Sequence, residues 1–141
     1  MNVTFKYGPL WASLLLLVLL LTFLAWPSEK VAPLWTLHAD PYKIEILTPG
    51  GVFRRGHNLV QVRAWRGDQP MVLRQGRVGL SMLWLDRKPH MHAQAILSRH
   101  RSSSALEGGL HFDMTGFWDG WIRVTTPTGP VAGVFRTEVV K

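Results

Sequence analysis

The first pattern along the chain is a long apolar stretch. Residues Tyr7 to Ser28 carry no charged side chain, and Leu10 to Trp26 are almost entirely apolar. A helix of this length, at about 1.5 Å per residue, spans about 33 Å, more than a hydrocarbon core of about 30 Å. Residues 7–28 are therefore predicted to form one N-terminal transmembrane helix.

The flanks of this stretch predict its orientation. Lys6 and the terminal amine precede it, so residues 1–6 are expected in the cytoplasm and the rest beyond a bacterial inner membrane, in the periplasm. The alternative is a cleaved signal peptide. That reading is disfavoured because signal sequences have shorter apolar cores and end in small residues, whereas Trp26 and Pro27 are bulky.

After the apolar stretch the periodicity changes. Residues 29–42 show no regular period and predict a linker. Beyond them, apolar and polar residues alternate in short segments separated by Gly and Pro, as residues 58–65 (NLVQVRAW) illustrate. Seven strands are expected, at 43–48, 58–65, 77–85, 91–97, 110–114, 121–125 and 131–140.

Short strands at this spacing, with no helical pattern after Trp26, predict an all-β domain over residues 43–141. Its length suits an immunoglobulin-like antiparallel β-sandwich, with a closed barrel as the alternative. The segment Gly116–Trp121 is rich in glycine and aromatics. We interpret it as a hairpin whose tryptophans fill the core, in preference to a carbohydrate or cofactor platform.

Composition narrows the classes of function. The chain has 16 Lys and Arg against 9 Asp and Glu, a net charge of +7, but no run of five basic residues and no nucleic-acid-binding motif. The charge favours an acidic protein surface or anionic lipid, and no nucleic acid is expected as a partner. The chain has no cysteine, which excludes a disulfide scaffold and thiolate metal sites. The motifs of common hydrolases and nucleotide-binding enzymes are also missing, so no enzyme is predicted.

Histidine and methionine supply the candidate chemistry. His90 and His92 stand two residues apart and share a face if the segment is extended, and Met82 and His111 lie on neighbouring predicted strands. Imidazole and thioether without thiolate are ligands that suit copper. The competing interpretation is structural: Met82 belongs to the core, and His90 and His92 are loop residues. His38, His57 and His100 are expected to be solvated.

Several landmarks together resemble a known family. They are the N-terminal anchor, Gly56–Val62 (GHNLVQV), the strand with Met82, the His-rich segment and Gly109–Trp118 (GLHFDMTGFW). The chain resembles the FixH/YtkA-like family of small membrane-anchored exported bacterial proteins over residues 43–140. The resemblance implies a copper-handling sandwich domain linked to the assembly of haem–copper cytochrome oxidases, and it matches Met82, His90 and His92 to the family's Met/His segment.

Two classes of function follow. In the first, the domain binds copper and serves a respiratory oxidase complex in the membrane as an accessory or assembly protein; a free-standing envelope copper-binding protein is its variant. In the second, the chain is a structural single-pass subunit of a membrane redox complex with no metal role. A domain that binds a small ligand is a weaker third reading.

The transmembrane helix is directly testable. We expect the protein to stay in the membrane pellet after an alkaline carbonate wash, because residues 7–28 would be held in the hydrocarbon core. Recovery of a soluble form that begins near residues 27–33 would show a cleaved signal peptide instead.

Overall fold

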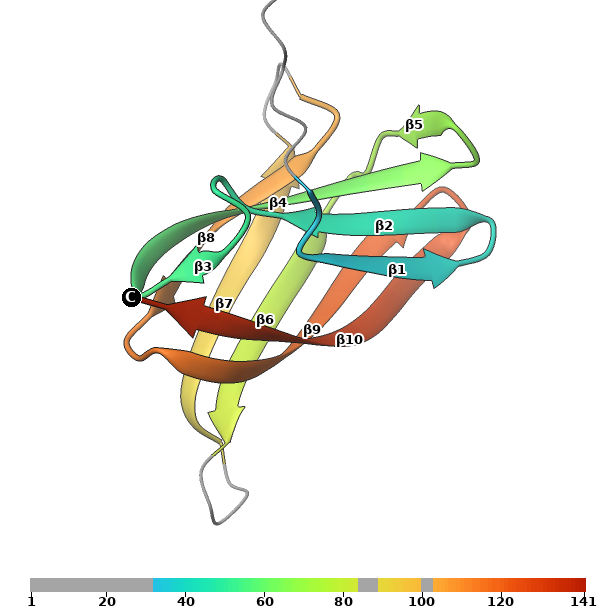
Figure 1. Cartoon of the computed structure of the whole chain (residues 1–141). Helices are drawn as coiled ribbons and strands as arrows, with labels where there is room; N and C mark the ends of the chain where they lie inside the picture. The colour runs from blue at the N-terminus through green and yellow to red at the C-terminus, as the bar shows by residue number, and fades with distance from the viewer. Residues whose placement is uncertain (1–31, 84–88, 100–102) are drawn as a thin grey trace, which may run out of the picture. The chain divides into compact units, whose positions relative to one another are not determined.

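The computed structural model describes residues 32–83, 89–99 and 103–141, all of which lie in strands, turns or irregular segments (Figure 1). For Leu83, Pro89 and His90 only the backbone is described. The strands are β1 (Trp35–Ala39), β2 (Tyr42–Leu47), β3 (Phe53–Arg54), β4 (Gly56–Arg66), β5 (Gln69–Met71), β6 (Gly76–Leu83), β7 (Pro89–Arg99), β8 (Leu106–Phe112), β9 (Gly116–Thr126) and β10 (Gly129–Val140).

The strands form one curled sheet in the order β1-β2-β4-β8-β7-β6-β9-β10-β3, with β5 on β4. All neighbours are antiparallel except β3 and β10. The long strand β7 joins the two halves: most of it pairs with β6, while Ser98 and Arg99 at its end pair with β8. The half containing β2, β4 and β8 and the half containing β6, β9 and β10 thus form one continuous surface.

The sheet curls until its first strand meets its far end. In Figure 1 β1 crosses β10, and the ring of Trp35 lies 5.4 Å from that of Phe135 on β10. Gly133 makes this approach possible, because a Cβ there would come within 2.8 Å of Trp35 and 2.9 Å of Leu37. The backbones of β1 and β10 are not paired, and side chains such as Trp35 and Leu37 close the inner face between them.

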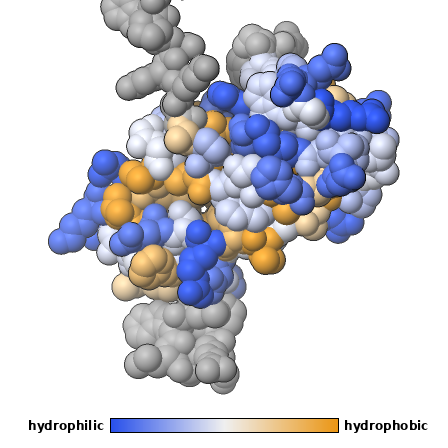
Figure 2. Space-filling model, turned by 45° about the vertical axis from the view of Figure 1, so that its right-hand side comes forward, coloured by the Kyte–Doolittle hydropathy of each residue, from blue (hydrophilic) through white to orange (hydrophobic). Residues whose placement is uncertain are grey.

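The core follows the alternation of the strands. On β4 the buried residues are Val60, Val62 and Ala64, while their neighbours in sequence face outward. The largest buried side chain, Trp118 of β9, meets Phe112 of β8 edge to face at 5.0 Å. Apolar side chains also reach the surface, in patches between charged residues on the face drawn in Figure 2.

These observations confirm the prediction of an all-β domain and correct three details. The linker predicted over residues 29–42 was wrong in its second half, since Trp35–Ala39 pairs with β2 and its apolar side chains seal the core. The hairpin at Gly116–Trp121 is instead the first half of the continuous strand β9, with Trp118 inside and Trp121 outside. The two-residue β3 and three-residue β5 were not predicted, being too short to show a period.

The predicted transmembrane helix lies outside the described residues. Within residues 32–83, 89–99 and 103–141 the structure contains no helix that could serve as a membrane span.

The aromatic core yields a stability prediction. Trp118 is 1% exposed, whereas Phe117 beside it on β9 is 65% exposed. We expect Trp118→Ala to lower the free energy of unfolding by about 3–5 kcal/mol, because it leaves a cavity and removes the contact with Phe112. The matched variant Phe117→Ala should change it by about 0.5 kcal/mol or less. Urea titration of the full chain in mild detergent measures both; equal losses would contradict the burial pattern.

Candidate functional site

The site begins at the tight turn between β3 and β4. Gly56 has a φ of +98°, a conformation that glycine adopts without strain. The side chain of Asn58 holds the turn closed: its Oδ1 accepts from the Arg54 amide at 2.8 Å, and its Nδ2 donates to the Arg54 carbonyl at 2.6 Å. These bonds fix the direction in which β4 starts. They therefore also fix the position of His57, which lies between Gly56 and Asn58 in the chain.

Strand pairing then brings His57 to a second histidine. In the register of β4 and β8, His57 lies directly opposite His111. Both side chains are exposed and point to the outer face, because Phe112, next to His111, and Val60, three residues after His57, face the core. The ring centroids are 4.4 Å apart and the two Nδ1 atoms 3.4 Å apart. Two exposed imidazoles thus lie against each other on adjacent strands, with their planes tilted by 59°.

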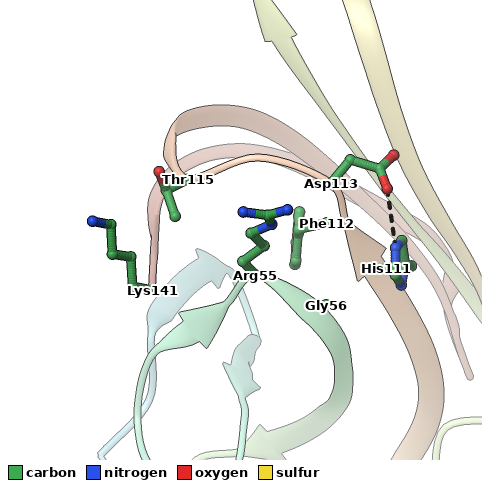
Figure 3. Close-up of a pocket in the computed structure, with 7 residues that line it drawn as sticks. All are labelled: Arg55, Gly56, His111, Phe112, Asp113, Thr115 and Lys141. Atoms are coloured by element: carbon green, nitrogen blue, oxygen red, sulfur yellow. Dashed lines mark hydrogen bonds and ion pairs between the residues drawn. The ribbon is translucent and has the colours of Figure 1, made fainter.

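A carboxylate orients the second histidine. Asp113 Oδ1 lies 3.0 Å from His111 Nε2 (Figure 3). The carboxylate can only accept, so His111 donates from Nε2, and in its neutral form it keeps Nδ1 as an acceptor for His57 Nδ1–H. The loop that carries Asp113 is tied down by Trp118, whose indole N–H donates to the Met114 carbonyl at 3.3 Å.

An open pocket of about 610 Å³ adjoins His111 and Asp113. The β3–β4 turn contributes Arg55, the β8–β9 loop contributes Thr115 and the end of β10 contributes Lys141 (Figure 3). The side chains of His111 and Asp113 remain 49% and 66% exposed. A soluble ion or a partner protein can therefore reach the pair directly.

The predicted ligands do not form one cluster among the described side chains. Met82 is partly buried and packs against the core, as the structural interpretation expected. His92 is exposed on the outer face of β7, opposite Ser81 of β6. The side chain of His90 lies outside the described residues. Of the predicted set, His111 is the residue that gains a second imidazole, from a histidine we had expected to be merely solvated.

The spacing of His57 and His111 suits binding of a metal ion, although these two side chains supply only two ligand atoms. Nitrogens bound to one ion at about 2.0–2.1 Å in a tetrahedral site lie about 3.3–3.4 Å apart, close to the observed 3.4 Å. A ligating histidine usually donates its other N–H to a carboxylate, as His111 does to Asp113. Nowhere in 32–83, 89–99 and 103–141 do three or more His, Asp or Glu side chains gather to hold a metal.

Comparison with known proteins shows the fold alone. No protein-family model matches the chain, and no curated protein matches it. Among solved structures it is similar to a crystal structure of a DUF4426 family protein from Pseudomonas aeruginosa PAO1, with a TM-score of 0.55 and 10% sequence identity. The match covers 75% of this chain and 96% of that one.

Proposed function

We propose that this chain is an exported domain that handles copper through His57 and His111. The proposal includes an immunoglobulin-like sandwich behind one N-terminal transmembrane helix, a place on the periplasmic side of a bacterial inner membrane, and no enzymatic activity. Its wider role would be that of an accessory or assembly protein of a respiratory haem–copper oxidase.

The observation that carries the copper site is the pairing of His57 with His111, with Asp113 behind it. In this arrangement the Nδ1 atoms of both rings would hold the ion, and Asp113 would keep the His111 ring in place. Imidazole is a ligand for both copper and zinc. The resemblance to the FixH/YtkA-like family favours copper.

The small number of ligands suits transfer better than storage. Two imidazoles leave coordination positions open, and both rings sit on an exposed sheet face. A partner would be able to add its own ligands before the ion leaves, which a closed four-ligand site forbids. The thioether of Met82 is not needed, since it packs against the core.

The suggestion of an oxidase partner rests on the family resemblance and on charge. Residues 31–141 contain fourteen Lys and Arg against eight Asp and Glu. Such an excess favours association with an acidic protein surface or anionic headgroups. The structural alternative, a subunit with no metal role, is supported by the lack of a three-ligand cluster in the described part of the chain.

Copper titration tests the site. We expect the full chain in detergent to bind one copper ion, and His57→Ala or His111→Ala to abolish binding, because each removes one of two ligands. Asp113→Asn should weaken it about 10–100-fold, as the loss of an orienting carboxylate does elsewhere. Calorimetry with Cu(II), and competition with a chelator for Cu(I), measure these affinities.

Two exposed histidines away from the pair serve as controls, His92 on β7 and His38 on β1. His38→Ala should bind copper like the unaltered chain. His92→Ala should also bind copper like the unaltered chain. Loss of copper binding in that variant would indicate that His90 and His92, the ligands predicted from the sequence, form the site instead. If the full chain takes up no copper at micromolar concentration, the copper site is refuted and the structural role without a metal remains as the explanation.

The oxidase role has a separate test. We expect oxidase subunits to co-purify with the protein from gently solubilised membranes through a tag at Lys141, and deletion of the protein to lower the copper content of the oxidase. An eluate without oxidase subunits, together with unchanged oxidase activity and metal content in the deletion strain, would refute the role while leaving the copper site standing.

A further inference from the structure

The outer face of β6, β7, β9 and β10 exposes large apolar side chains on adjacent strands. Trp121 of β9 lies opposite Val134 of β10 and Gly79 of β6, and Ile96 of β7 lies opposite Arg77 of β6. Val134 is 78% exposed and Ile96 is 74% exposed, and Phe117 lies farther along β9. Single exposed apolar residues are common, but Trp121 and Val134 lie side by side on paired strands with Ile96 on the same outer face, and such a group marks an interaction surface.

Trp121 is held flat in this group. A Cβ on Gly79 would come within 2.7 Å of three atoms of the indole, Cε2, Cζ2 and Nε1. Glycine therefore lets the ring lie directly on the backbone of β6, where any other residue would push it away. The tryptophan remains 41% exposed while its position is fixed. A partner that covers it loses little side-chain entropy from ordering it.

Two arginines beside the tryptophan face each other across the strands. Arg77 of β6 is the direct partner of Arg123 of β9, a placement that is unfavourable for like charges. Among the described residues neither forms a salt bridge. The next cation on this face is different: Arg136 binds Asp119 through two bonds of 2.6 and 3.1 Å, and this pairing lowers the pKa of Asp119. Among the described residues, the positive charge on this face that has no ionic partner therefore lies at Arg77 and Arg123.

We propose that this face, formed by Arg77, Ile96, Trp121, Arg123 and Val134, docks on the anionic surface of a lipid bilayer. Tryptophan is enriched at membrane interfaces, where its ring sits at headgroup level. The facing arginine pair suits lipid phosphates, which would relieve the repulsion between the two guanidinium groups. The aliphatic side chains would enter the boundary between headgroups and acyl chains.

Because the proposed transmembrane helix already holds the domain at the membrane, weak binding of this face to lipid would be enough to dock it. This inference therefore rests on the membrane-anchored part of the proposed function. The predicted helix ends at Ser28, and Leu34 already bonds to β2 through its amide. The six residue steps between them span at most about 21 Å. Tethering on so short a linker gives the domain a high effective concentration at the bilayer.

The absence of cysteine permits a direct test, because one introduced thiol is unique. The full chain is reconstituted into nanodiscs of phosphatidylglycerol or of phosphatidylcholine, with a polarity-sensitive fluorophore on Val134→Cys. We expect a shift to shorter wavelength in the anionic discs, reversed by 1 M salt, where the screening length is about 3 Å. The same label on Leu59→Cys, exposed on the outer face of β4, should not shift.

Charge variants give the size of the effect. Arg77→Gln and Arg123→Gln should each lower the ratio of docked to free domain about fivefold, which corresponds to about 1 kcal/mol per arginine near an anionic surface. Arg63→Gln, on the outer face of β4, is the matched control. An unshifted Val134 label in anionic discs would overturn the proposal. The proposal would also be overturned if the label at Val134→Cys were buried in native membranes but not in the lipid nanodiscs, because a protein would then be covering this face.

The test separates this inference from the proposed function. Incorporation of the chain into the discs reports the anchor, and copper titration of the same discs reports the histidine pair. A chain that incorporates and binds copper but leaves Val134 in water would overturn the docking face alone.

Discussion

The structure depends on the burial of one face of a single sheet. In the described part of the chain no helix covers that face, so the sheet buries it by curling until β1 packs on β10. Gly133 is essential to this closure, since a side chain there would hold Trp35 away from the strand. The curl also explains the length of β7, which must pair with β6 in one half and reach β8 in the other. Burial thus determines which strands become neighbours.

Burial also fixes the register, and through it the candidate site. A slip of one residue in β4 would turn Val60 and Val62 outward and bring the polar Gln61 and the charged Arg63 toward the core. The register that avoids this places His57 opposite His111. The outer face does not contribute to this choice, so its residues can vary without endangering the fold. Paired imidazoles, an exposed tryptophan and facing arginines all occur there, as expected if the inner face carries stability and the outer face carries function.

Alternation along the strands was enough to predict an all-β domain and most of the long strands, because period-two burial is a local property. It missed Trp35–Ala39, whose pattern is hidden between prolines and whose burial comes from contact with β10. The candidate site was half predicted: His111 was chosen for its residue type, while His57 was taken for a surface residue. Their sequence separation of 54 residues is closed by the pairing of β4 with β8, which no local pattern reports. The contact between Gly79 and Trp121 is hidden in the same way, because it joins two strands.

The two proposed surfaces lie on different halves of the sheet, and this separation bears on how they would act together. The histidine pair is on the outer face of β4 and β8, and the Trp121 surface is on the outer face of β6 and β9. Because the halves enclose the core between them, their outer faces point away from each other. A domain docked on lipid through Trp121 would therefore turn His57 and His111 toward the aqueous side. An ion held there would be open to a partner that rises above the bilayer, whereas docking through the histidine face would hide it. The two proposals are thus compatible in one orientation, and that orientation follows from the curl of the sheet.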